Sequence, residues 1–64
     1  MLRINGEESN AAGMLVSDYL SKEGYNQKLV AVELNGEILP KAKYGETVLK
    51  DGDSVEVVSF VGGG

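Results

Sequence analysis

The chain has 64 residues, with no cysteine and no histidine, and its ten acidic and six basic side chains give a net charge of −4. A chain of this length forms one domain that buries only about 60% of its unfolded surface, which leaves no room for a deep catalytic cleft. The composition also excludes disulfides and histidine-activated nucleophiles, and the negative charge opposes binding to nucleic acids or anionic membranes.

The first element is predicted to be a β-hairpin. Leu2 and Ile4 alternate with polar residues, which is the pattern of a half-buried strand. Asn5-Gly6 is the favoured pair for a two-residue type I′ turn. The chain should therefore double back through residues 7–10.

An amphipathic helix is predicted to follow, starting near residue 14. Leu15 and Tyr19 are four residues apart, as are Val16 and Leu20, so that both pairs lie on one helical face. Gly24 provides a left-handed C-terminal stop. The start of the helix lacks the Ser, Thr or Asp that usually caps a helix.

A pair of strands comes next. Residues 28–34, KLVAVEL, are apolar enough for an inner strand or for one that is covered on both faces. A second Asn-Gly pair, at positions 35–36, turns the chain into a short strand at residues 37–39. Pro40 ends the pairing because it has no N–H group to donate.

The last strand is expected over residues 54–61, SVEVVSFV, after a helical turn at 41–44 and a tight polar turn at 51–53. Its β-branched run would promote aggregation at the edge of a sheet, so we expect it between other strands and beside the first strand. One helix then crosses one face of a mixed sheet. This arrangement is an α+β fold of the β-grasp, or ubiquitin-like, type.

Alternation along the last strand divides its side chains between two faces. Val58 and Phe60 share one face with Glu56, whereas Val55 and Val57 lie on the other. One face must meet the helix. If the other is only partly covered, Val58 and Phe60 form a docking patch for partner proteins next to the C-terminal tail. The alternative is that both residues belong to the core of so small a domain.

Two further groups of side chains are interpreted as structural. Asp51 and Asp53 could suggest a metal site, but two carboxylates in a turn are more often turn formers, so no metal site is predicted. The serine and threonine hydroxyls have no histidine or cysteine to activate them. We therefore do not expect the chain to be an enzyme.

No segment predicts attachment to a membrane. The longest apolar runs fall far short of the roughly 18 residues that span a bilayer. Residues 1–5 alternate and do not resemble a secretory signal. We therefore expect a soluble, cytoplasmic protein.

Residues 32–64, VELNGEILPKAKYGETVLKDGDSVEVVSFVGGG, resemble the ThiS family, the sulfur carrier proteins of thiamine biosynthesis. The similar features are the Asn-Gly-Glu hairpin before Pro40, the Lys-Asp-Gly-Asp turn at 50–53 and the final diglycine. Together with the helix that stops at Gly24, the resemblance covers nearly the whole chain as one carrier domain, residues 1–64. The chain departs from the family at Met14, where a capping Thr is common, and at Gly62, a third glycine.

The resemblance implies a chemical role for Gly64. A terminal carboxylate is anionic at neutral pH and a poor electrophile, so it needs activation with ATP. An adenylating enzyme of the ThiF type, related to ubiquitin-activating enzymes, would supply that step, and the carrier itself would bind no cofactor. Sulfur from a sulfur-donating protein would then displace AMP. The resulting thiocarboxylate would deliver sulfur to a ThiG-type thiazole synthase.

The other tail glycines are implied to act as partner-binding residues. Gly62 and Gly63 have no Cβ atoms, so with Gly64 they form a flexible tail that can thread narrow channels. Three extended residues reach roughly 10 Å beyond Val61. Extra residues after Gly64 would place the reactive carbonyl in an ordinary peptide bond, so the position of the chain end is expected to be part of the chemistry.

Three other functions stay open. The small subunit of molybdopterin synthase has the same fold and also ends in diglycine, but it is usually longer. A ubiquitin-like modifier would join its last glycine to lysines of target proteins. A non-covalent binding module would carry an inert tail. The sequence identifies neither the sulfur donor nor the sulfur-containing product.

Overall fold

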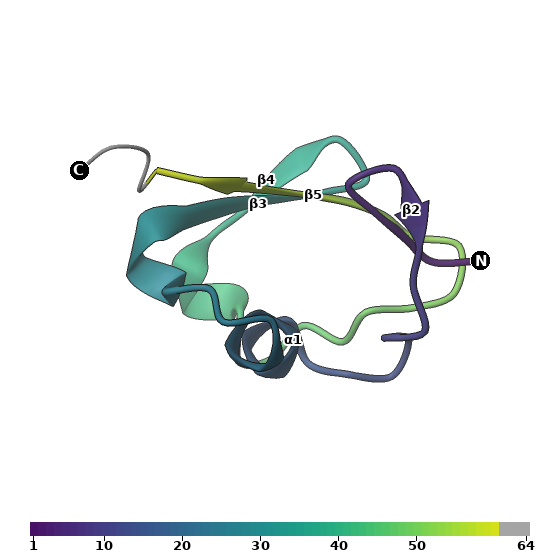
Figure 1. Ribbon diagram of the computed structural model, residues 1–64, viewed down its shortest axis with the longest axis horizontal. Helices are drawn as coiled ribbons and strands as arrows, with labels where there is room; N and C mark the ends of the chain where they lie inside the picture. The colour runs from purple at the N-terminus through teal and green to yellow at the C-terminus, as the bar shows by residue number, and fades with distance from the viewer. Residues whose placement is uncertain (61–64) are drawn as a thin grey trace.

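The structure, a computed structural model, describes residues 1–60. They form a five-stranded mixed sheet in the order β2-β1-β5-β3-β4. Figure 1 shows the sheet almost edge-on, with the helix α1 on one side of it. The elements are β1 (Arg3–Ile4), β2 (Glu7–Glu8), α1 (Val16–Lys22), the 3₁₀ turn η1 (Gln27–Leu29), β3 (Val30–Leu34), β4 (Glu37–Leu39), the 3₁₀ turn η2 (Lys41–Lys43) and β5 (Ser54–Ser59).

β5 lies in the middle of the sheet, as its sequence predicts. It runs parallel to β1, with Val55 opposite Ile4. On its other side it runs antiparallel to β3 over five register pairs, from Val30 opposite Ser59 to Leu34 opposite Val55. β5 therefore has a neighbouring strand on each side, β1 along Ser54–Val55 and β3 along nearly its whole length.

Both Asn-Gly turns have the backbone conformation that the sequence predicts. Asn5 and Gly6 have φ angles of 53° and 82°, and Asn35 and Gly36 have φ angles of 54° and 88°. Positive φ at both central positions defines a type I′ turn, and asparagine and glycine tolerate it better than other residues.

The two turn asparagines also hold β5. The Asn35 side chain accepts a hydrogen bond from the Ser54 N–H at 2.9 Å. On the other side, β1 ends at Ile4, and the Asn5 side-chain oxygen accepts the Val57 N–H at 2.8 Å. The backbone of β1 turns away after Ile4, and the Asn5 side chain then supplies the hydrogen-bond acceptor for β5 on this side. The β5 backbone is therefore hydrogen-bonded on the β1 side as far as Val57.

The helix begins at Val16, later than predicted, and the missing cap signal has a physical explanation. Leu15 occupies the N-cap position without a side-chain hydrogen bond. The first helical N–H groups find partners elsewhere in the chain: Val16 donates to the Thr47 carbonyl at 2.9 Å and Ser17 to the Tyr44 carbonyl at 3.0 Å. A distant loop therefore replaces the cap. The stop at Gly24 is confirmed by its φ of 83°.

Two strands differ from their predicted limits: β3 starts later than predicted, and β5 ends before the last residues predicted for it. β3 starts at Val30 rather than at residue 28, because Asn26 accepts the Lys28 N–H at 3.0 Å and caps the η1 turn. β5 ends at Ser59, although the Phe60 N–H still donates to the Leu29 carbonyl at 2.7 Å. The remainder of the predicted strand and the predicted tail, residues 61–64, lie outside the described residues.

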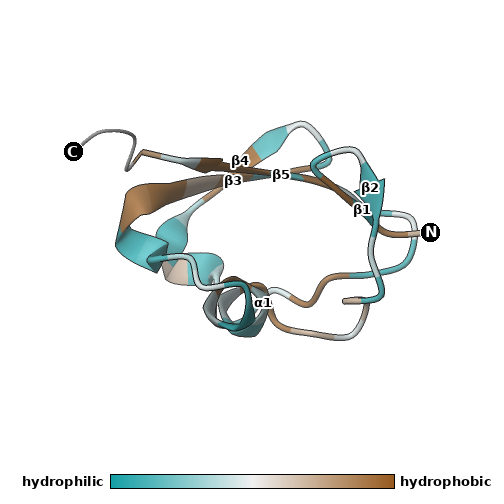
Figure 2. Ribbon diagram, in the orientation of Figure 1, coloured by the Kyte–Doolittle hydropathy of each residue, from teal (hydrophilic) through white to brown (hydrophobic). Residues whose placement is uncertain are grey.

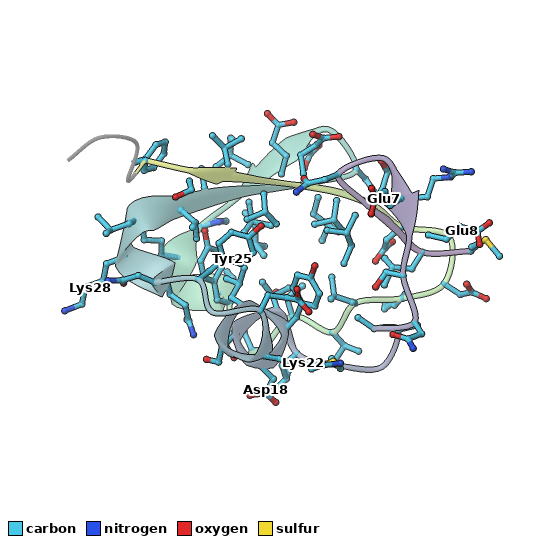
Figure 3. All side chains as sticks on the ribbon, in the orientation of Figure 1. Glu7, Glu8, Asp18, Lys22, Tyr25 and Lys28 are labelled. Atoms are coloured by element: carbon cyan, nitrogen blue, oxygen red, sulfur yellow. The ribbon has the colours of Figure 1, made fainter. Side chains whose placement is uncertain are left out.

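The core fills the space between the sheet and α1. Its most buried large side chains are Leu2, Val16, Leu20, Val30, Val32 and Leu49. In Figure 3, Tyr25 lies between the sheet and α1, whereas Asp18 and Lys22 project from the helix on the side away from the sheet. Val55 and Val57 are buried, and Leu34 packs against the core while only partly buried. The inner face of β5 is therefore the one that carries Val55 and Val57.

We predict that Asn5→Gly lowers the free energy of unfolding by about 1–2 kcal/mol, because the half-buried Val57 N–H loses its acceptor while the turn keeps a residue that tolerates positive φ. Chemical denaturation measures this loss. The control is Asn10→Gly, the same replacement at an exposed residue with no hydrogen bond or ion pair. An Asn5→Gly variant no less stable than Asn10→Gly would show that the side-chain clamp contributes nothing.

Candidate functional site

The outer face of the sheet, on the side away from α1, carries the two residues that the sequence proposes for docking. Val58 is 53% exposed and Phe60 is 61% exposed. The alternative that both belong to the core is therefore wrong. Their binding to a partner stays a prediction, since exposure shows that they are accessible and not what they contact.

Strand register extends this exposed apolar area beyond β5. Ala31 on β3 lies opposite Val58, and the Phe60 N–H bonds to the Leu29 carbonyl. Ile38, 64% exposed, is the register partner of Glu33 on the neighbouring edge strand β4. We call Ala31, Ile38, Val58 and Phe60 the outer patch. In Figure 2, brown apolar segments mark β3 and β5, which carry the buried core valines as well as residues of the outer patch.

Ile38 was not identified from the sequence as a surface residue, although the hairpin sequence contains the information needed to place it on the outer face. The two-residue turn at 35–36 fixes the register of the hairpin, so that Leu34 pairs with Glu37 and Glu33 with Ile38. Because Leu34 faces the core, Ile38 must share the outer face with Glu33. An exposed isoleucine at that position marks it as part of a surface rather than of the core.

The predicted tail follows directly from this patch along the chain. Phe60 is the last described residue, and Gly62, Gly63 and Gly64 lie outside the described part of the chain. A partner that holds the outer patch would therefore contact the chain two residues before the first tail glycine. Contact areas of this type combine exposed apolar side chains with a polar rim.

Acid–base groups with altered pKa values lie on the other side of the sheet. Burial raises the pKa of Tyr44, and burial together with the nearby Glu23 charge raises the pKa of Tyr19. Tyr44 is a core residue, and Tyr19 packs against the core. Neither phenol is placed to act on a group bound at the outer patch.

The aspartates of the tight turn hold the backbone in place. The two carboxylate oxygens of Asp53 accept from the Asn35 side chain at 3.1 Å and from the Lys50 N–H at 3.0 Å. Asp51 lies 3.2 Å from the N-terminal amine. Across residues 1–60, no three acidic side chains are grouped closely enough to hold a metal ion. The same part of the chain contains no helix with the length and hydropathy needed to cross a membrane.

Comparison with known proteins places the chain among small sulfur carriers. The model of the ThiS family matches residues 2–64. The sulfur carrier protein ThiS of Bacillus subtilis is 40% identical, and the match covers 100% of both chains. The crystal structure of a thiamine biosynthesis protein (ThiS) from Geobacter metallireducens superposes with a TM-score of 0.76 at 39% identity, covering 98% of this chain and 97% of that one.

Larger relatives match as well. A thiazole synthase of Paramagnetospirillum magneticum is 48% identical over 98% of this chain, and one of Magnetococcus marinus is 41% identical over the same share. The chain spans only 20% of the length of each of these two proteins. The likeness therefore concerns one part of them.

We predict that Phe60→Asp leaves the free energy of unfolding within about 0.5 kcal/mol of the unaltered chain, because the side chain is exposed. Val57→Asp, three positions earlier on the inner face, places a charge in the core and should remove most of the stability of the domain. Thermal or chemical denaturation of the two variants measures both effects. Unfolding of Phe60→Asp would mean that the aromatic ring packs into the core.

Proposed function

The chain belongs to the ThiS family of sulfur carriers, and we propose that Gly64 holds the sulfur as a C-terminal thiocarboxylate used for thiazole formation in thiamine biosynthesis. The observation that carries this proposal is the match to sulfur carriers along their full length. The final Gly63-Gly64 pair of the sequence supplies the residue that would be modified. The chain is a carrier and not a catalyst.

The proposed chemistry first activates the Gly64 carboxylate and then replaces one of its oxygens with sulfur. A carboxylate oxygen attacks the α-phosphorus of ATP and releases pyrophosphate, which turns a poor electrophile into an acyl-adenylate. The outer sulfur of a persulfide on a sulfur-donating protein then attacks the carbonyl carbon, and AMP leaves with the oxygen that bonded to phosphorus. A thiol attacks the donor's sulfur in the resulting acyl disulfide, which releases the thiocarboxylate and leaves the donor in a disulfide. The ATP belongs to an adenylating enzyme of the ThiF type, and the carrier supplies only the carboxylate.

The folded domain contributes recognition and position. β5 is hydrogen-bonded on both sides, so the strand leads the chain toward the tail from a fixed place in the sheet. We propose that the outer patch, with Val58 and Phe60 nearest the tail, docks on the adenylating enzyme while Gly62, Gly63 and Gly64 enter its active site. Glycines suit this role because they lack a Cβ atom that would widen the chain.

A ThiG-type thiazole synthase is the proposed receiver of the sulfur. Support comes from the two relatives named thiazole synthase, which contain a segment similar to this chain. Joining the two activities in one protein would raise the effective concentration of the carrier at the enzyme. A covalent protein modifier would instead transfer Gly64 to a lysine of a target protein.

We predict that the purified chain, incubated with a ThiF-type enzyme, ATP and a sulfur donor, gains the mass difference between one sulfur and one oxygen atom, located at Gly64 by fragmentation mass spectrometry. Deletion of Gly64 should abolish the gain. Phe60→Asp should slow it while the domain stays folded, because docking is weakened. If the mass shift survives the deletion, or no adenylate forms, the binding module with an inert tail becomes the better description.

A matched pair of glycine variants separates tail chemistry from general effects. Gly63→Ala should slow the reaction because one methyl group widens the tail and restricts its backbone. Gly45→Ala makes the same replacement at a glycine whose added Cβ meets nothing within 4 Å and whose φ is not in the left-handed region. Equal rates for the two variants would show that the width of the tail is not what the glycines provide.

A further inference from the structure

Two glutamates face each other in the middle of the outer sheet surface. Glu33 and Glu56 are register partners in the antiparallel pair of β3 and β5, and both are exposed. The Cβ atoms of such partners lie about 4.5–5.5 Å apart, and like charges directly opposite one another destabilise a sheet. The free protein therefore holds an unfavourable arrangement at this position.

The described part of the chain does not neutralise this pair. Within residues 1–60 the ion pairs are those of the N-terminal amine with Asp51 and of Lys43 with Glu46. Arg3, which lies opposite Ser54 and thus two residues along β5 from Glu56, donates to the Gly6 carbonyl at 3.1 Å. Neither Glu33 nor Glu56 therefore takes part in an ion pair within residues 1–60.

The outer patch adjoins the pair on two sides. Ile38 is the register partner of Glu33 on β4, and Val58 follows Glu56 on the same face of β5. Residues two apart on a strand are separated by about 6.5–7 Å, so one side chain of a partner can reach the carboxylates while its neighbours cover Val58 and Ile38. Covering the apolar side chains would remove water from the carboxylates and strengthen any ion pair formed there.

We propose that this surface binds a partner protein by taking up an arginine or lysine between Glu33 and Glu56, with apolar side chains of the partner on the outer patch. An arginine suits the site best because its planar group has five N–H donors and can bond two carboxylates at once. The net charge of −4 favours approach of such a basic surface. The inference rests on the proposed function, and the occupant is the ThiF-type adenylating enzyme, which must act on the tail first.

The proposal makes stability and binding change in opposite directions. In the double variant Glu33→Gln/Glu56→Gln, the melting temperature at low salt should rise because the repulsion is removed, and the gain should shrink in about 1 M salt as charges are screened. Affinity for the adenylating enzyme, measured by titration calorimetry, should fall about tenfold or more. A role confined to folding would not give this opposite pair of effects.

Glu7→Gln/Glu37→Gln is the matched control. It removes the same number of charges from the same sheet, but Glu37 is the register partner of Leu34, which packs against the core, and Glu7 is that of the buried Ile4, so neither belongs to the outer face. Its affinity for the enzyme should change by less than about twofold. A loss equal to that of the double variant would attribute the effect to net charge alone and overturn the inference.

The remaining outcomes are also decisive. Unchanged affinity of the double variant, with the Gly64 mass shift intact, overturns this inference and leaves the proposed function standing. Failure of the unaltered chain to bind the enzyme or to gain sulfur overturns both. Weaker binding to thiazole synthase alone would overturn the assignment of the adenylating enzyme as the occupant, and a double variant that melts lower would show that the pair stabilises the fold.

Discussion

The pairing of β5 on both sides is the constraint on which the rest of the molecule depends. Its N–H and C=O groups meet β1 on one side and β3 on the other. Where β1 is too short, the Asn5 side chain supplies the missing acceptor. Because alternate β5 residues point to opposite faces, the same strand closes the core with Val55 and Val57 and exposes Val58 and Phe60.

One strand, β5, thus carries both the core valines and part of the surface that is proposed to bind partners. The inner face of β5 contributes buried apolar area to the core, and a domain of this size buries little apolar area in total. The outer face leaves the apolar patch and the Glu33–Glu56 pair accessible, and we expect two like charges in register to lower the stability of the free protein. Proteins commonly give up stability where a surface serves binding. Under the proposed function, the fold presents the chain that leads to Gly64 and partner enzymes carry out the chemistry.

Local signals were enough to predict much of the fold, while distant contacts explain what was missed. The Asn-Gly turns and the Gly24 stop follow from positive φ, which few residue types accept, and the central place of β5 follows from its apolar run. The ThiS family and the β-grasp fold, both predicted from the sequence, are confirmed.

The start of α1 was predicted too early, because its first N–H groups bond to carbonyls about thirty residues away rather than to a local cap. The start of β3 was misplaced because Asn26 caps a 3₁₀ turn at Gln27–Leu29, whose last two residues are predicted to belong to the strand that follows. At the site, alternation separated Val58 and Phe60 from the inner valines, but only the packed helix shows which face is outside. Ile38 can be assigned to the outer patch only when the register of the β3–β4 hairpin is known.

Native-state hydrogen exchange of the β5 amides tests most directly whether the strand is held from both sides. We expect the Ser54 and Val57 amides, which donate to the Asn35 and Asn5 side chains, to exchange only when the whole domain unfolds. Their protection should then match that of amides in the β3–β5 ladder. Exchange of the Val57 amide at the rate of an unprotected peptide, with the ladder still protected, would contradict the clamp and the fixed position of the strand that leads to the tail.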